Sequence, residues 1–175
     1  MQLSFPSFMT KSLLTKRTKG SIDMYFALDQ EPPEDELEAD MFLDIRMKSF
    51  LENKSYNAVI NHYTKNNDLS GICMLIAHGD SYKNKWIYSD SKNDFSVQSW
   101  INKKDGQYGL LILRCCNLDA VPVQSKKSAI IFPNMDYSDA MLNDGEVQLE
   151  LFIPGRGYLD SYEVDAYIQE HNLNV

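Results

Sequence analysis

The sequence is poor in cysteine and has no hydrophobic run long enough to cross a membrane. Three cysteines, two of them adjacent, occur in 175 residues. So few thiols are typical of a reducing compartment and not of a disulfide-rich secreted protein. A transmembrane helix needs about 20 predominantly apolar residues in succession, and no segment of the chain offers them. These absences predict a cytoplasmic protein that does not insert into a membrane.

Positive charge and phosphate-binding motifs are also scarce. The chain has 17 Lys and Arg against 25 Asp and Glu, a net charge of −8. That balance disfavours nonspecific nucleic-acid binding, because the phosphate backbone would be repelled overall. Neither G-x-G-x-x-G nor G-x-x-x-x-G-K-[ST] follows any predicted strand, which argues against a dinucleotide or P-loop enzyme. We expect no nucleic-acid partner and no cofactor.

What remains is ordinary globular composition, with 43 % hydrophobic and 24 % charged residues. The length favours one domain with a proper core. Residues 1–20 differ from the rest, because they carry Lys11, Lys16, Arg17 and Lys19 and no acidic residue. An organelle transit peptide has a similar composition. We interpret residues 1–20 as a basic N-terminal arm and residues 21–175 as a single domain.

Hydrophobic spacing predicts strands and helices in alternation along this domain. Three segments are apolar throughout their length, as in strands buried on both faces of a sheet. In Glu146–Ile153, apolar and polar residues alternate instead, as in a strand with one face exposed to solvent. Strands are predicted at Ile22–Leu28, Gly71–Gly79, Tyr108–Leu113, Ser128–Phe132 and Glu146–Ile153, and helices at Glu34–Glu52, around Tyr56–Tyr63, from Val97 with Asp94 as its cap, and from Asp160. This order predicts an α/β fold, a three-layer sandwich with a mostly parallel central sheet.

Reactive residues stand at the ends of two of the buried strands. His78 and Gly79 close one strand, and Cys115 and Cys116 follow the next, one crossover later. In open α/β sheets, functional groups collect at the carboxyl ends of parallel strands. An imidazole beside a thiol suits acyl transfer, because the thiolate attacks a carbonyl while the imidazole moves the proton. Arg114 would share the face of Cys116, where its charge favours the thiolate.

These two strand ends resemble those of the caspase-like cysteine peptidases, the group that includes caspases, legumain, separase and CHAT domains. Met74–Gly79 is similar to their strand ending in His-Gly, and Leu110–Cys116 to their strand ending in the nucleophile. The resemblance implies a caspase-like fold and a cysteine endopeptidase acting on a peptide or protein substrate, with Cys116 as nucleophile and His78 as general acid/base. It also implies an oxyanion hole formed by the N–H groups of Gly79 and Cys116, and frequent control by a regulatory partner.

Asp29 follows the first predicted strand and could reach the same sheet edge. In relatives that cleave after basic residues, an acidic residue in this neighbourhood lines the substrate pocket. The resemblance therefore implies cleavage after basic residues, with Asp29 binding the substrate. As a turn former before the proline pair, Asp29 also has a purely structural interpretation.

Three other interpretations stay open at this point. The domain could be a catalytically inactive caspase-like module that binds a partner protein, since fold does not imply function. It could also be a flavodoxin-like binder of a small molecule. A zinc site would have to draw on Cys73, His78, Cys115, Cys116, His62 and His171. We predict no metal, because adjacent cysteines on a strand face opposite ways and no C-x-x-C spacing occurs.

Overall fold

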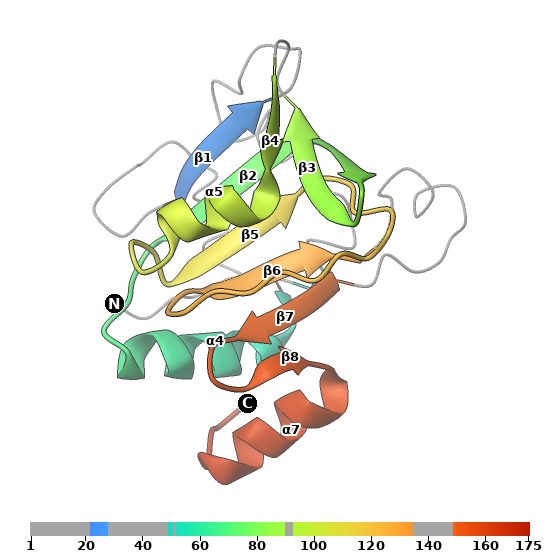
Figure 1. The fold of residues 1–175 in the computed structure, drawn as a ribbon. Coiled ribbons are helices and arrows are strands. Elements are labelled where there is room, and N and C mark those ends of the chain that lie inside the picture. Colours follow the sequence, from blue (N-terminus) through green and yellow to red (C-terminus); the bar gives the residue numbers. More distant parts are fainter. Residues whose placement is uncertain (1–21, 28–48, 51, 90–92, 135–148) are drawn as a thin grey trace.

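The protein is an α/β sandwich built on one open sheet (Figure 1). The computed structural model describes residues 22–27, 49–50, 52–89, 93–134 and 149–175. Its strands are β1 (Ile22–Ala27), β2 (Ile72–Tyr82), β3 (Lys85–Ser89), β4 (Asp94–Ser96), β5 (Leu110–Arg114), β6 (Ala129–Pro133), β7 (Leu149–Ile153) and β8 (Gly157–Leu159), and its helices are α4 (Lys54–Asn66), α5 (Val97–Lys104) and α7 (Ser161–Glu170). The α/β class predicted from the sequence is confirmed. The predicted basic arm, Asp29 and most of the Glu34–Glu52 helix lie outside the described residues.

The sheet is mixed, whereas the sequence predicted a mostly parallel one. Its strand order is β4-β3-β2-β5-β6-β7-β8, and β1 pairs with the first half of β2. β1, β2, β5 and β6 are parallel to one another, but β3, β4, β7 and β8 are added as antiparallel strands. At β3 the antiparallel direction arises from a tight hairpin with β2. Lys83 and Asn84 both have positive φ, 49° and 61°, as a two-residue primed turn requires.

The hairpin explains why β2 is longer than predicted. The sequence pattern ended this strand at His78 and Gly79, but β2 continues to Tyr82 and pairs there with β3. Its first six residues are buried and the remainder alternate between exposed and half-buried. The apolar run therefore marked only the part of β2 that is covered on both faces, and the polar part is an ordinary hairpin strand.

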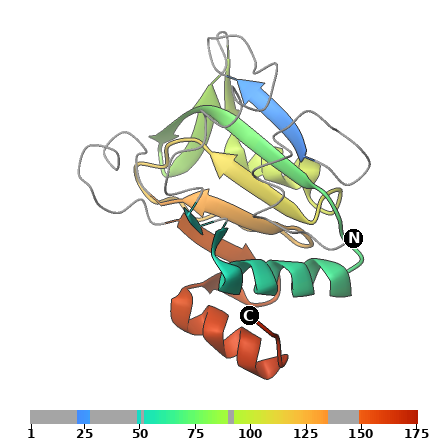
Figure 2. The same cartoon turned by 180° about the vertical axis from the view of Figure 1, so that it is seen from behind.

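Two hydrophobic cores lie on opposite faces of the sheet, and helices cover both (Figures 1 and 2). On one face, α4 and α7 pack over alternate strand residues such as Met74 and Ile112. On the other, α5 packs over the intervening residues, such as Leu75 and Leu111. The period-two alternation of the central strands thus sends consecutive side chains into different cores. The described elements therefore form three layers.

Polar side chains cap the helices where the chain leaves the strands. Asp160 accepts the N–H of Glu163 at 2.9 Å and begins α7, as predicted. Ser96 caps α5 by accepting the N–H of Ser99 at 3.1 Å. The prediction that Asp94 caps α5 is wrong, because Asp94 begins β4 and accepts the Ser89 hydroxyl at 2.6 Å. Ser96, two residues later, supplies the hydrogen-bond acceptor that the first turn of α5 requires.

Candidate functional site

The strands that end in His78 and Cys116 are neighbours. β2 and β5 pair in parallel from Ile72 opposite Leu110 to Ile76 opposite Arg114. Side chains alternate along a strand, so His78 has the parity of Met74, which lies in the core covered by α4 and α7, whereas the Cβ position that meets the Cys116 backbone is that of Gly79, the next residue. Cys116 packs against this core and is half-buried, and His78 is exposed. The predicted adjacency of the two strands is confirmed.

Gly79 lies directly against the backbone of Cys116. A methyl group added at Gly79 would overlap the carbonyl oxygen of Cys116 and lie 2.8 Å from its nitrogen. Glycine is needed here because the polypeptide of β2 approaches the end of β5 too closely for any side chain. The sequence analysis placed this glycine at the close of the strand, but β2 continues past it. The structure brings the His78-Gly79 segment and Cys116 together.

Two further side chains fix the chain immediately after the thiol. Trp86, only 3 % exposed, donates its indole N–H to the carbonyl oxygen of Cys116 at 2.8 Å. Asn117 is fully buried; its amide donates to the carbonyls of Val121 and Pro133, and its oxygen accepts the N–H of Val121. Buried polar groups satisfied in this way hold one backbone conformation. Sequence reasoning missed this role of Trp86, because nothing local predicts its bond to a residue thirty positions away.

The two adjacent cysteines have different surroundings. Cys115 belongs to the core beneath α5 and is 1 % exposed. Burial strongly raises the pKa of the Cys115 thiol, and the neighbouring Cys116 raises it further, whereas the charge of Arg114 acts in the opposite sense. A buried thiol of high pKa is inert as a nucleophile. Of this pair, only Cys116 has the exposure that a substrate requires.

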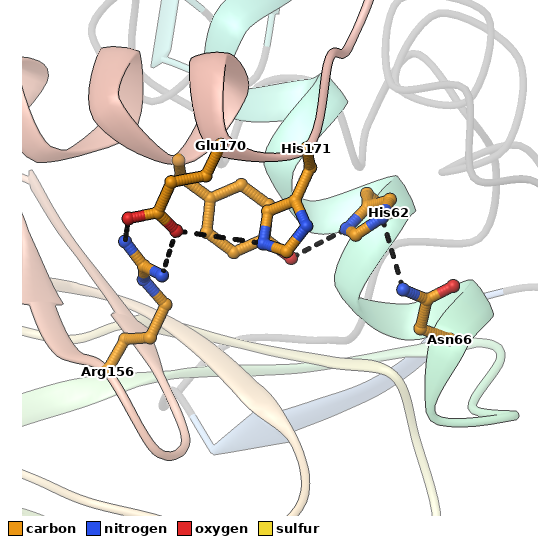
Figure 3. Close-up of polar contacts among 6 residues, drawn as sticks. His62, Asn66, Arg156, Glu170 and His171 are labelled. Carbon is orange, nitrogen blue, oxygen red and sulfur yellow. Dashed lines mark hydrogen bonds and ion pairs between the residues drawn. The ribbon is translucent and has the colours of Figure 1, made fainter.

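A second cluster of titratable side chains joins α4 to the end of α7 (Figure 3). Nδ1 of His62 lies 2.7 Å from the Tyr167 hydroxyl, and Nε2 lies 3.1 Å from Nδ2 of Asn66. The His171 ring lies 4.5 Å from the His62 ring and 4.4 Å from that of Tyr167, between centroids. Burial lowers the pKa of His62, and the positive charges of His171 and Lys65 lower it further. This cluster fastens α7 to α4.

An ion pair closes the same cluster. Nη1 of Arg156 lies 2.7 Å from Oε2 of Glu170, and the guanidinium lies 4.9 Å from the centre of the Tyr167 ring. Hydrogen bonding to Arg156 lowers the pKa of the Glu170 carboxyl. Both side chains are exposed enough for solvent to screen the pair. Their position in the turn between β7 and β8 and at the end of α7 gives them a structural role.

The side chains considered for zinc are dispersed over the molecule. Cys73 and Cys115 lie in the core beneath α5, whereas His62 and His171 lie between α4 and α7. Within the described ranges, no three His, Cys, Asp or Glu side chains are grouped closely enough to hold one metal ion. Cys73, Cys115 and Cys116 form no disulfide. Near the other pair of candidates, the described part of the chain brings Gly79, the residue after His78, against the backbone of Cys116.

Comparison of the chain with protein-family models, curated proteins and solved structures gave no match. Among the helices that the structure describes, none has both the length and the apolar character needed to span a bilayer.

Proposed function

We propose that the protein is a cysteine endopeptidase of caspase-like type in which Cys116 is the nucleophile and His78 the general acid/base. The observation that carries the proposal is the contact between Gly79 and the Cys116 backbone, just beyond the point where the parallel pairing of β2 and β5 ends. It brings the residue next to His78 against the residue that bears the thiol. The order of a histidine strand, a hairpin, a helix and a cysteine strand supports the caspase-like assignment.

The chemistry follows from these two groups. His78 takes the proton of the Cys116 thiol, and the thiolate sulfur attacks the carbonyl carbon of a peptide bond. The N–H groups of Gly79 and Cys116 stabilise the oxyanion of the tetrahedral intermediate. Protonated His78 then gives its proton to the leaving amine, and the C–N bond breaks to leave a thioester. His78 next deprotonates a water molecule, which hydrolyses the thioester and restores the thiol.

The surroundings of the thiol suit this role. Trp86 and Asn117 hold the chain after Cys116, so the sulfur starts from a fixed position. Cys115, buried on the far face, does not compete for the substrate. Three thiols without a disulfide are compatible with the proposed cytoplasmic location. The proposed preference for basic residues rested on Asp29, which lies outside the described residues.

The first test is the reactivity of the three thiols. The folded protein would be treated with a limiting amount of iodoacetamide near neutral pH, and alkylation would be quantified by peptide mapping. We expect Cys116 to react at least about tenfold faster than Cys73 and Cys115. In His78→Ala the labelling of Cys116 should slow, and its pH profile should move to higher pH. His171→Ala is the matched control, because this histidine lies in the separate cluster beside α4.

The second test is peptide-bond cleavage itself. A mixed peptide library incubated with the protein and analysed by mass spectrometry should show new termini, and Cys116→Ala should abolish them. We expect His78→Ala to lower the rate about 10²–10⁴-fold. Equally slow alkylation of all three thiols, with no cleavage, would contradict the proposal and favour an interaction module. A small molecule that copurifies with the protein would favour a binder.

A further inference from the structure

We propose that a cavity between the start of α4, β7 and the start of α7 binds the ammonium or guanidinium group of an organic cation. The cavity has a volume of about 620 Å³, enough for a long basic side chain. Two kinds of side chain determine its chemistry: aromatic ones from Phe50, Tyr56 and Tyr158, and acidic ones from Glu150, Asp160 and Glu163. Among the described residues that line it, none is a lysine or an arginine.

Three of the lining residues are aromatic, the type of side chain that attracts organic cations. The rings of Phe50 and Tyr56 lie 4.3 Å apart between centroids, tilted by 36°. Tyr158 is fixed from the other side, because its hydroxyl donates to the carbonyl of Val123 at 2.8 Å. A cation over such rings is attracted by their quadrupole, and the attraction grows when the site is partly desolvated. The lining therefore offers more than negative charge.

Two of the carboxylates have neutral hydrogen-bond partners in the structure, whereas Glu163 also interacts electrostatically with the guanidinium of Arg156. One oxygen of Asp160 accepts the N–H of Glu163, and Oε1 of Glu150 lies 3.4 Å from the amide of Asn134. Burial raises the pKa of Tyr56 and of Tyr158; Asp160 adds to the first shift and Glu150 to the second. Asp160 therefore acts on Tyr56 and Glu150 on Tyr158, and a cation between acidic and aromatic groups of the lining would be stabilised by both.

The cavity lies at the edge of the sheet where β6 ends, the edge at which Cys116 follows β5. Its lining comes from both faces: Phe50 and Tyr56 pack on the same core as Cys116, whereas Tyr158 packs against Phe152 of the opposite core. β7 begins beside the end of β6, with Leu149 opposite Pro133, and α4 begins at the edge where β2 ends (Figure 2). In the proposed endopeptidase, the cavity would bind a lysine or arginine side chain of the substrate. This role rests on the proposed function, whereas cation binding does not.

The test uses the full-length Cys116→Ala variant, which cannot cleave a peptide, and follows its backbone amide NMR signals. Four probes would be titrated: acetyl-Gly-Arg-amide, acetyl-Gly-Lys-amide, the neutral isostere acetyl-Gly-citrulline-amide, and spermidine. We expect the two basic peptides to shift the amides of Tyr56, Glu150, Tyr158 and Glu163. The citrulline peptide should leave them in place. Raising the salt concentration should weaken the binding.

Two variants of equal net charge separate the cavity from the overall acidity of the protein. Glu150→Gln/Glu163→Gln should weaken binding of the arginine peptide at least about tenfold. Asp68→Asn/Asp119→Asn removes the same charge from two exposed residues outside the cavity and should leave the affinity for the arginine peptide unchanged.

Each outcome bears on the proposal. Binding of spermidine without binding of the basic peptides would support the cation pocket and assign it to a free polyamine. Equal shifts with arginine and citrulline, or no shift at these amides with any cation, would overturn it. Because the nucleophile is absent from these samples, this result is independent of whether the wild-type protein cleaves peptides.

Discussion

At the scale of single residues, adjacent positions in the chain have opposite chemistry. Cys115 and Cys116 are neighbours in sequence, yet one is sealed beneath α5 and the other is half-exposed beside Gly79. The reason is the alternation of side chains along β5, which gives each face of the sheet every second residue. Whether a thiol here can react is therefore decided by the parity of its position.

The substitution Gly79→Ala should separate the end of β2 from the end of β5. The added methyl group would overlap backbone atoms of Cys116, which cannot rotate away as a side-chain tip could. We expect the free energy of unfolding to fall by about 1–3 kcal/mol, measured by urea denaturation, and the alkylation rate of Cys116 to change.

Gly155→Ala provides the control for this prediction. A methyl group there meets nothing within 4 Å, and only the positive φ of 84° opposes it. If both variants lost equal stability and the reactivity of Cys116 stayed the same in Gly79→Ala, close packing at Gly79 would not be important.

At the scale of elements, one carboxylate ties α5 to the start of β6. Asp105, the residue that ends α5, accepts the backbone N–H groups of Lys126, Lys127 and Ser128 at 2.7–2.9 Å. Burial alone would raise the pKa of Asp105, but these hydrogen bonds outweigh it and lower the pKa. The segment between β5 and β6 is thus anchored at both ends, by Asn117 and by Asp105.

We expect Asp105→Asn to lower the free energy of unfolding by about 1–3 kcal/mol near pH 7, because an amide cannot accept all three N–H groups equally well. A carboxyl whose pKa is lower in the folded state stabilises the fold above its unfolded pKa of about 4, and this contribution is lost as the pH falls further. The stability difference between wild type and variant should therefore shrink below about pH 4. Urea titrations at several pH values measure it.

Asp119→Asn is the control for this experiment, because Asp119 is exposed in the same segment. A difference between Asp105→Asn and wild type that stayed constant down to about pH 2 would show that the ionised carboxylate is unimportant.

At the scale of the whole molecule, stability is concentrated where helices cover both faces of the sheet. Residues in the middle of β2, β5 and β6 are completely buried, whereas β4, β8 and α7 form the margins. Local opening at the margins exposes little apolar surface, so it costs less free energy than opening of the centre.

Hydrogen exchange should therefore be slowest at the backbone amides of Leu75, Ile112 and Ile131, which are completely buried in the two cores. We expect these amides to exchange only by global unfolding, and those of α7 and β4 to exchange at least about 100-fold faster. NMR exchange rates in D₂O measure this directly. Protection of α7 equal to that of β5 would show that the His62–Tyr167–His171 cluster makes the helix part of the cooperative core.

Much of this architecture was predictable from the sequence. The apolar runs of β2, β5 and β6, the cap at Asp160 and the opposite orientation of Cys115 and Cys116 were all predicted, because they depend on residues within one turn or one strand. The hairpins were underestimated. Their turn at Lys83 and Asn84 lacks the glycine that usually marks a primed turn, so only the backbone angles identify it.

The sequence by itself determined the α/β class and the faces of the central strands, because side-chain alternation and burial are local consequences of the order of residues. Only the tertiary structure decided that Gly79 meets the Cys116 backbone, that Trp86 holds the same carbonyl, and that aromatic and acidic residues enclose one cavity. These contacts join residues far apart in the chain, and the mutual packing of strands and helices brings them together.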